Sequence, residues 1–411
     1  MIYNATIYND SWNTKKLHEL GDFSRGKSKH RPRNDPKLFD NGEYPLVQTG
    51  DIKAATLYIS KHEEAYNEFG LSQSKLWPTG TLCITIAANI AETGILAYPM
   101  CFPDSIVGFT ANQSETSERF MHYIFTYIRQ SIQNSVSGSI QDNINIEYLK
   151  SLDFKIPEKP YQDKIVSILS GLDEKIELNL KICSELEAMA KALYDYWFVQ
   201  FDFPDENGKP YRTSGGEMVW NEQLKREIPK GWEVTNIGKI TANFDSRRIP
   251  LSQNERNSMK GDIPYYGATG VMDYVDRFIF DGQYVLIAED GSVMDSDGYP
   301  IVQMIWGKAW VNNHAHVLEG HNGYSNELLY FVLKDIPVIK IMTGSIQKKI
   351  NQDNLNNYKI PQIPHKIANR FTSILKPIFS KLRAVEIENS ELTKLRDWLL
   401  PMLMNGQARV E

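Results

Sequence analysis

The sequence predicts a mixed α/β protein of the α+β class, in which two tandem domains each end in a long helix. Three observations carry this prediction: a sequence repeat, β-rich runs upstream of each copy, and a heptad pattern of apolar residues downstream of each copy. A repeat sets the architecture before any local assignment. We therefore expect two dissimilar front parts closed by similar ends, and two helices forming an antiparallel coiled coil with a pseudo-twofold relation.

The repeat joins a Gly-Ser-Ile-Gln turn to a Lys-Ile-Pro segment. The first copy, Val136 to Gln141, is followed by Ile144, Asn145, Leu149 and Lys155-Ile156-Pro157; the second, Met342 to Gln347, is followed by Ile350, Asn351, Leu355 and Lys359-Ile360-Pro361. Gly138 and Gly344 permit backbone geometries that other residues resist. We interpret the turns as structural, with side chains that cap the turn or touch a phosphate: Ser139, Gln141, Ser345 and Gln347.

The two front parts begin at Trp12 and Trp232 and read as mixed α/β. Leu82 to Ile86 and Tyr284 to Ala288 are short β-rich runs bounded by Gly and Asp, which is typical of buried strands. Segments 120–132 and 326–333 have helical spacing, and Pro and Gly residues predict irregular loops between the strands. Each front part should therefore contain a sheet covered by a helix.

Each end carries a heptad seam. From Ile165 to Trp197, and again from Phe371 to Leu403, apolar positions recur at alternating steps of four and three, the spacing of a coiled coil. Ordinary amphipathic helices, each packed on its own domain, are the alternative interpretation. Prolines at 377 and 401 should kink or shorten the second helix.

Antiparallel pairing in a register whose paired positions sum to 568 places Asn179 opposite Asn389. Two facing amides satisfy one another, whereas a slipped register leaves each against an apolar side chain at a cost of roughly 1–3 kcal/mol. Arg396 opposite Leu172 is the weak point. The same register pairs Ile176 with Leu392, Cys183 with Val385, Leu186 with Leu382, Ala190 with Ile378 and Leu193 with Leu375.

These features divide the chain into five parts: a first front domain (1–157), a central helix (158–200), a connector (201–230), a second front domain (231–362) and a distal helix (363–411). The connector is rich in turn-forming residues such as Pro204, Gly208 and Pro210.

Composition is that of a soluble globular protein, with 42% hydrophobic and 23% charged residues. The N-terminal residues lack an apolar core, so they do not form a signal peptide, and no window is apolar for the roughly 18 residues that a membrane span needs. The three cysteines, Cys83, Cys101 and Cys183, show no metal-ligand spacing. We expect a cytoplasmic protein.

A basic cluster is the strongest nucleic-acid signal, although the net charge is −6. A solvated loop is its alternative interpretation, but its density and the flanking Pro32 and Pro36 favour phosphate contacts, which position a domain on DNA without specifying sequence. The cluster contains Arg25, Lys27, Lys29, His30, Arg31, Arg33 and Lys37.

The second unit offers a thinner counterpart. Arg247 and Arg248 follow Trp232 at the corresponding stage, and Lys348 and Lys349 adjoin the second repeat turn. Base reading needs donors and acceptors at loop tips, such as Asn or Gln facing adenine, although turn formation is the commoner role of a single Asn or Gln. The candidates for base reading are Gln48, Asn89, Asn312, Asn313 and His314.

No catalytic constellation is found in the sequence. There is no Asn/Asp-Pro-Pro-aromatic motif of an amino-methyltransferase, no phosphate-binding loop of a translocase and no convincing nuclease motif. Adjacent acids such as Glu289 and Asp290 are interpreted as loop solvation. His314 and His316 lack a third ligand in sequence, so we expect no metal.

In combination these motifs resemble the specificity (S) subunit of type I restriction-modification systems. The resemblance rests on the two Gly-Ser-Ile-Gln turns, the Trp197 to Phe203 segment, the Glu227 to Trp232 segment and the tail from Leu399 to Gly406, and it covers the whole chain. It implies two target-recognition domains, each reading one half of a bipartite double-stranded DNA site, and helices that dock two methyltransferase (modification) subunits. It implies no catalysis or cofactor here: S-adenosylmethionine belongs to those subunits, and ATP and Mg²⁺ to restriction (translocase) subunits, of which two can join.

Two other classes remain open at this stage. A protein-protein scaffold would bridge subunits without DNA, and retention on DNA in the presence of the modification subunit discriminates against it. An enzyme with an unrecognised site, or the specificity part of a related single-complex restriction-methylation enzyme, is the other.

Overall fold

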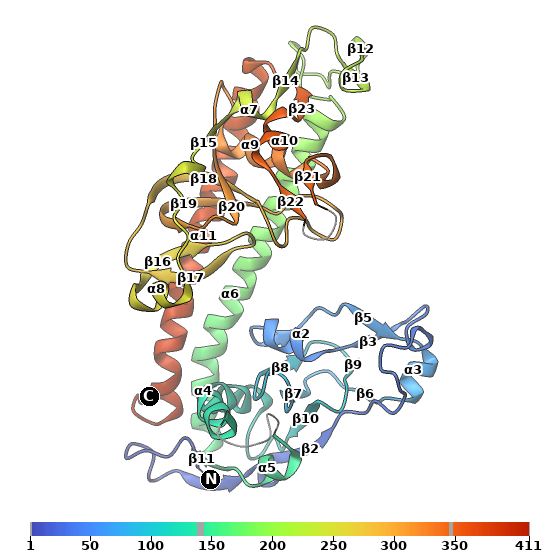
Figure 1. Ribbon diagram of the computed structural model, residues 1–411. Coiled ribbons are helices and arrows are strands. Elements are labelled where there is room, and N and C mark those ends of the chain that lie inside the picture. The colour runs from blue at the N-terminus through green and yellow to red at the C-terminus, as the bar shows by residue number, and fades with distance from the viewer. Residues whose placement is uncertain (1, 138–143, 345–347, 411) are drawn as a thin grey trace. The chain divides into compact units, whose positions relative to one another are not determined.

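The computed structural model describes residues 2–137, 144–344 and 348–410. The chain forms two compact units: unit 1 comprises Met1–Lys181 with Ile387–Glu411, and unit 2 comprises Ile182–Glu386 (Figure 1). These units cut across the predicted boundaries, because each unit contains one half of each long helix. The unit boundary therefore falls within the helices and not at the connector.

Unit 1 is built on a five-stranded sheet of order β2-β10-β7-β8-β4, against which the long helix α4 (Glu118–Ser137) packs. A smaller four-stranded sheet has the order β5-β3-β9-β6. The strands are β1 (Asn13–Lys16), β2 (Gly21–Arg25), β3 (Tyr44–Leu46), β4 (Tyr58–Ile59), β5 (Glu64–Tyr66), β6 (Leu76–Trp77), β7 (Leu82–Thr85), β8 (Thr93–Leu96), β9 (Met100–Cys101), β10 (Ile106–Ala111) and β11 (Asp153–Ile156). The short helices are α1 (Leu17–Leu20), η1 (Pro36–Leu38), α2 (Thr49–Ala54), α3 (Glu68–Ser72) and α5 (Ile146–Lys150).

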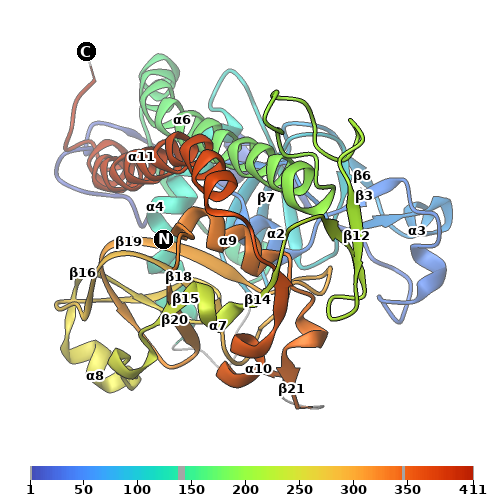
Figure 2. The ribbon, with the colours of Figure 1, turned by 90° about the horizontal axis from the view of Figure 1, so that it is seen from above.

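Unit 2 is built on a six-stranded sheet of order β15-β20-β18-β19-β16-β17. Helix α9 (Asn326–Lys334) lies between this sheet and the first half of the long helix α11 (His365–Met404) (Figure 2). The strands are β12 (Met218–Asn221), β13 (Arg226–Pro229), β14 (Val234–Asn236), β15 (Thr241–Asn243), β16 (Lys260–Tyr266), β17 (Val271–Val275), β18 (Phe280–Ala288), β19 (Val302–Val311), β20 (Ala315–Gly320), β21 (Met342–Thr343), β22 (Lys349–Ile350) and β23 (Lys359–Pro361). The short helices are α7 (Ile237–Ile240), η3 (Asp245–Arg247), α8 (Gln253–Ser258), η4 (Val338–Lys340) and α10 (Gln352–Asn357).

The two front parts share one sheet topology despite their dissimilar sequences. In each unit a short edge strand (β2 or β15) pairs with the strand that precedes the covering helix (β10 or β20), and that strand pairs with the predicted buried strand (β7 or β18). The next strand, β8 or β19, then pairs with a parallel neighbour, β4 or β16. The predicted pseudo-repeat therefore extends into the front parts.

The repeated sequence has a physical explanation in both copies. Asn145 and Asn351 are N-caps whose side chains accept hydrogen bonds from the third residue of α5 and α10, and they satisfy backbone donors that a helix start leaves free. Leu149 and Leu355 are the buried residues of these two helices. The Lys-Ile-Pro segments, in β11 and β23, pair with β1 and β14, so the end of each front part is fastened to its beginning.

The long helices are α6 (Lys159–Tyr194), continued by the π-helical turn η2 (Asp195–Val199), and α11 (His365–Met404). Within unit 1 they are antiparallel: Asn179 Nδ2 donates to Asn389 Oδ1 at 2.9 Å, and Arg396 donates to Asp173 Oδ1 at 2.9 Å. The asparagine pair is the one that the 568 register predicts. Asn179 is 1% exposed, so its amide needs this partner.

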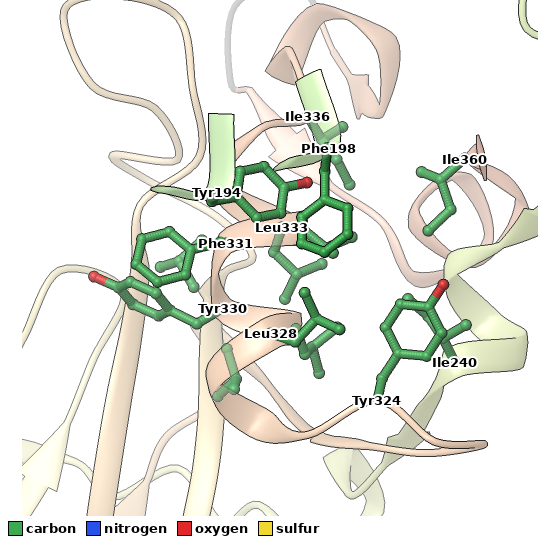
Figure 3. Packing of buried hydrophobic residues seen from close by; sticks show 14 of the residues in the cluster. Tyr194, Phe198, Ile240, Tyr324, Leu328, Tyr330, Phe331, Leu333, Ile336 and Ile360 are labelled. Carbon is green, nitrogen blue, oxygen red and sulfur yellow. The ribbon is translucent and has the colours of Figure 1, made fainter. Parts of the chain in front are cut away.

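In unit 2 the heptad positions of α6 and α11 pack together with aromatic side chains. The core of this unit includes Ala190, Leu375, Ile378 and Leu382, with Cys183, Leu186 and Leu193 packed against it. Tyr194, Phe331 and Tyr330 interlock in the same core (Figure 3). Helix ends thus pack on their own domain as well as on each other, and both interpretations of the heptad pattern hold in part.

Two expectations about α11 need correction. Pro377 and Pro401 do not shorten the helix, which continues over 40 residues to Met404. Burial of Leu375, Ile378 and Phe379 beside Pro377 stabilises helical geometry that the missing N–H weakens. The predicted weak point, Arg396 opposite Leu172, is not one, because the guanidinium of Arg396 pairs with the buried carboxylate of Asp173, the next residue along α6. Among the described residues, no helix is long and apolar enough to cross a membrane.

Candidate nucleic-acid interface

In unit 1 the basic segment leaves the sheet where several strands meet. Arg25, the last residue of β2, pairs with Val107, and the ladder continues from Ile106 to Thr85 and from Ile84 to Thr93. The loop 86–92, which contains Asn89, therefore begins at the same end of the sheet as the basic segment. The structure brings these two predicted elements together.

Three of the seven basic residues of the segment pair with carboxylates within the unit. Arg33 donates to Asp104 at 2.5 Å, and Arg31 lies 3.7 Å from the same carboxylate. His30 bonds Asp35 at 2.8 Å, and this hydrogen bond, followed by that from the backbone of Lys37, lowers the pKa of Asp35. Sequence inspection missed Asp104 because it lies 71 residues from Arg33.

The other cations of the segment point to solvent. Arg25, Lys27, Lys29 and Lys37 are exposed, and their side chains form no ion pair within the described residues. Backbone bonds still fix the segment: Lys29 N–H donates to Gln73 O at 3.1 Å, and Ser74 Oγ donates to Lys27 O at 2.9 Å. Four exposed cations on one backbone segment, anchored at Lys27 and Lys29, are suited to phosphate contact.

The base-reading candidates of unit 1 are less free than predicted. Gln48 is exposed, but its amide donates to Glu64 at 3.0 Å and its backbone caps α2. Asn89 is half-buried and its backbone carbonyl accepts a bond from Thr85 Oγ1, but its side-chain amide makes no hydrogen bond within the described residues. Asn89 remains the better placed of the two.

In unit 2 the two arginines after β15 have different roles. Arg248 is 13% exposed, pairs with Glu289 at 2.7 Å and donates to Ala315 O at 2.7 Å. It is a structural residue, which corrects the expectation of a phosphate contact. Arg247 is exposed, lies 4.7 Å above the Phe280 ring and donates to Ile279 O, so its guanidinium is oriented but accessible.

Arg248 belongs to a buried charge network that sequence spacing did not reveal. Asp245, Glu289 and His316 place one ligand-type atom each within 4.8 Å of one another. Burial opposes charge on Asp245 and Glu289, but the hydrogen bonds of His316 and Lys349 outweigh it and lower the pKa of each acid. Because Arg248 and Lys349 already balance both carboxylates, the cluster is a poor fit to a divalent cation.

The remaining candidates of unit 2 are mixed. Asn312 is 2% exposed and its Oδ1 accepts the His314 N–H at 2.8 Å, so it shapes the β19–β20 turn and does not face solvent. Asn313 and His314 are exposed on that turn, and His314 bonds Asp290. Lys348 is half-buried with Nζ 3.8 Å from Met294 Sδ, and Lys349 pairs with Glu289.

The repeat turns are only partly described. Gly344 has φ of 85°, the left-handed geometry expected of it. Gly138, Ser139, Gln141, Ser345 and Gln347 lie outside the described residues.

Comparison with known proteins places the whole chain. The family model for the type I restriction modification DNA specificity domain matches residues 9–188 and 229–394. A specificity subunit of the MjaIX type I restriction enzyme of Methanocaldococcus jannaschii is 26% identical over 97% of this chain and 94% of that protein. A type I specificity subunit of Haemophilus influenzae, described there as putative, is 35% identical over 38% of this chain and 40% of its own length.

A solved structure has the same fold. The type I restriction-modification S subunit from M. genitalium aligns with a TM-score of 0.55 and 18% identity over 98% of this chain and 99% of that one. The family model matches twice, and each match spans one front part together with most of the long helix that follows it in the chain. The chain therefore belongs to the type I restriction modification DNA specificity family.

Proposed function

We propose that each unit reads one half of an asymmetric, bipartite double-stranded DNA site. The observation that carries the proposal is the shared sheet, in which exposed basic residues lie at the end of the equivalent edge strand of both units: the segment from Arg25 to Lys37 at the end of β2, and the single residue Arg247 after β15. Two different loop sets on one frame should read two different half-sites. The half-sites would lie about one DNA turn apart, by analogy with other paired readers.

As the specificity component, the chain selects the sequence and its partners perform the chemistry. Two modification subunits would dock on the helices and the connector, and two restriction (translocase) subunits could join them. S-adenosylmethionine would belong to the modification subunits, and ATP and Mg²⁺ to the restriction subunits. The acidic residues of the connector, such as Asp205 and Glu206, provide a charged surface for such docking.

The decisive experiment has two stages. Methylome sequencing of a host that carries the chain with its modification partner would give the recognised site. Fluorescence anisotropy with that DNA, at several salt concentrations, would then compare the assembled complex with a variant carrying Arg25→Gln, Lys27→Gln and Lys29→Gln. A matched control is Lys61→Gln, which is exposed and follows β4 at the opposite end of the same sheet.

The expected result follows from counterion release. Each lost phosphate contact reduces the slope of log K against log salt by about 0.9, so three contacts reduce it by roughly 2.7, with little change in sequence preference. Lys61→Gln should leave the slope unchanged. An unaltered slope in the triple variant would show that the DNA-binding surface of unit 1 lies elsewhere. Absence of any DNA binding by the complex would favour a protein scaffold that does not bind DNA.

A further inference from the structure

Unit 2 contains a cavity of about 120 Å³ where the end of α6 meets the connector and α9. Its walls come from segments far apart in sequence: Tyr194 and Phe198 at the end of α6, Arg226 and Trp232 from the connector region, and Asp335 just after α9. The repeated segment Lys359 to Pro361 completes it. An apolar site of about 150 Å³ can hold benzene, so this cavity suits a group slightly smaller than benzene.

Tyr194 is a buried polar group without a protein partner. It is only 5% exposed, and its hydroxyl makes no hydrogen bond within residues 2–137, 144–344 and 348–410. Figure 3 shows the hydroxyl on the side where Phe198 and Ile336 lie, and both of these residues line the cavity. Trp77 Nε1 is the one fully buried side-chain atom without a partner among the described residues, so the Tyr194 hydroxyl is not sealed off and stays available to a group that enters the cavity.

Asp335 is the second polar group at the cavity whose side chain has no partner in the described part of the chain. Its carboxylate lines the same cavity, is half-buried and makes no hydrogen bond or ion pair with the described part of the chain. Burial raises the pKa of Asp335 and outweighs the opposing charges of Lys191 and Arg226. The same carboxylate acts on Tyr194: burial, and then the negative charge of Asp335, raise the pKa of the Tyr194 phenol.

The neighbouring cations are already engaged. Lys191 Nζ bonds both oxygens of Asp195 at 2.5 and 2.6 Å. Arg226 donates to Val199 O at 3.2 Å and stacks over Phe201 at 4.8 Å. Lys359 Nζ donates to the side chain of Gln223 at 3.0 Å. None of them supplies the donor that Asp335 lacks.

We propose that this cavity binds a cationic donor group, a guanidinium or primary ammonium on a short apolar stem, between the Asp335 carboxylate and the Tyr194 hydroxyl. The aromatic walls, including Trp232 and Tyr358, suit such a group because a cation is attracted to ring faces. The carboxylate accepts its N–H donors, and the phenol oxygen accepts another. The group could be a side chain of a partner subunit or a free amine, and both have this chemistry.

Calorimetric titration of the full-length chain with methylguanidinium chloride at constant ionic strength tests the binding directly. N-methylurea, a neutral molecule of similar shape, and inorganic phosphate are the comparison ligands. We expect saturable binding of methylguanidinium alone, at least ten-fold weaker in Asp335→Asn and three- to ten-fold weaker in Tyr194→Phe. The matched control is Asp353→Asn, an exposed aspartate on α10 outside the cavity, which should bind as the native chain does.

A second measurement distinguishes the sources, and only this arm rests on the proposed function. If a partner side chain fills the cavity, Asp335→Asn weakens assembly with the modification subunit at least ten-fold and methylguanidinium competes with assembly. If a free amine fills the cavity, methylguanidinium binds the native chain as expected above, and Asp335→Asn leaves assembly with the modification subunit unaffected. Equal binding of N-methylurea, preferential binding of phosphate, or no binding of methylguanidinium together with unaltered assembly would overturn the proposal. None of these outcomes depends on DNA binding, so a failure here is separate from failure of DNA recognition.

Discussion

The buried ion pair of unit 1 gives the sharpest prediction about stability. Arg396 on α11 donates to Asp173 on α6, and Tyr123 on α4 donates to the other carboxylate oxygen at 2.6 Å. The Asp173 side chain is only 2% exposed. Three helices therefore share one carboxylate, and the recognition domain of unit 1 is fastened to both long helices through it.

Arg396→Met keeps the apolar stem and removes the charge, so Asp173 stays buried with a single neutral donor. Loss of one partner of a buried pair costs about 3–5 kcal/mol. With a urea m value of about 2–3 kcal/mol/M for a unit of this size, the unfolding midpoint should fall by roughly 1–2.5 M. Arg383→Met is the matched control on the same helix: its pair with Glu386, 3.8 Å apart, is largely exposed and should contribute less than about 1 kcal/mol.

Unit 2 supplies the compensated variant. Counted from the residues that cap the covering helices, Ser117 and Ser325, Tyr123 corresponds to Phe331. By the heptad seam, Asp173 corresponds to Phe379 and Arg396 to Ala190, so an apolar cluster replaces the ion pair. Replacing all three groups together with those of unit 2 should recover most of the lost stability, since no charge is left buried. A midpoint for Arg396→Met within 0.3 M (about 0.6–0.9 kcal/mol) of the native value would refute this reasoning.

Three further predictions follow. Cysteines at Ile176 and Leu392, in a chain with Cys183→Ala, should be joined by a short bis-maleimide, because facing helices lie about 8–10 Å apart; cross-linking from position 177 instead would contradict the 568 register. In unit 2, burial disfavours the charged form of His316, but its bond to Asp245 outweighs burial and raises the pKa of His316. Its stabilising contribution should be complete below the unfolded value of about 6.5 and be lost as pH rises through the folded pKa, so melting temperature against pH should flatten in His316→Gln but not in the exposed His321→Gln. Finally, the purified chain with S-adenosylmethionine and DNA should transfer no methyl group until the modification subunit is added, and transfer by the chain alone would restore the enzyme alternative.

Local sequence was sufficient to predict the geometry at positions where the repeat or the heptad spacing places an Asn in a defined structural role. The N-caps Asn145 and Asn351, and the paired amides Asn179 and Asn389, are positions where spacing alone indicates the geometry. The continuity of α11 at Pro377 could not be predicted, since the stabilising contacts come from another helix in the fold. Where a local signal such as proline opposes a helix, the tertiary packing of the apolar face determines whether the helix continues.

The candidate site was less predictable, for the same physical reason. A basic residue is available to DNA only if no carboxylate neutralises it, and the neutralising partners are distant in sequence: Glu289 lies 41 residues from Arg248. Charge density therefore located the segment after β2 but did not separate Arg25 and Lys27, which are free, from Arg31 and Arg33, which share Asp104.

Because the two units share one sheet topology, the charges at equivalent positions of the two units can be compared directly. Counting from the paired residues Gly21 and Thr241, Arg25 in unit 1 corresponds to Asp245 in unit 2, and Lys27 corresponds to Arg247. At the same point of one frame, unit 1 presents free cations and unit 2 buries an ion network. Phosphate contacts should therefore be concentrated in unit 1, and unit 2 should depend more on base edges and groove shape. Such a division would let two halves of one chain bind a single duplex with unequal salt dependence, because the frame sets position while the loops and their charge pairing decide what is contacted.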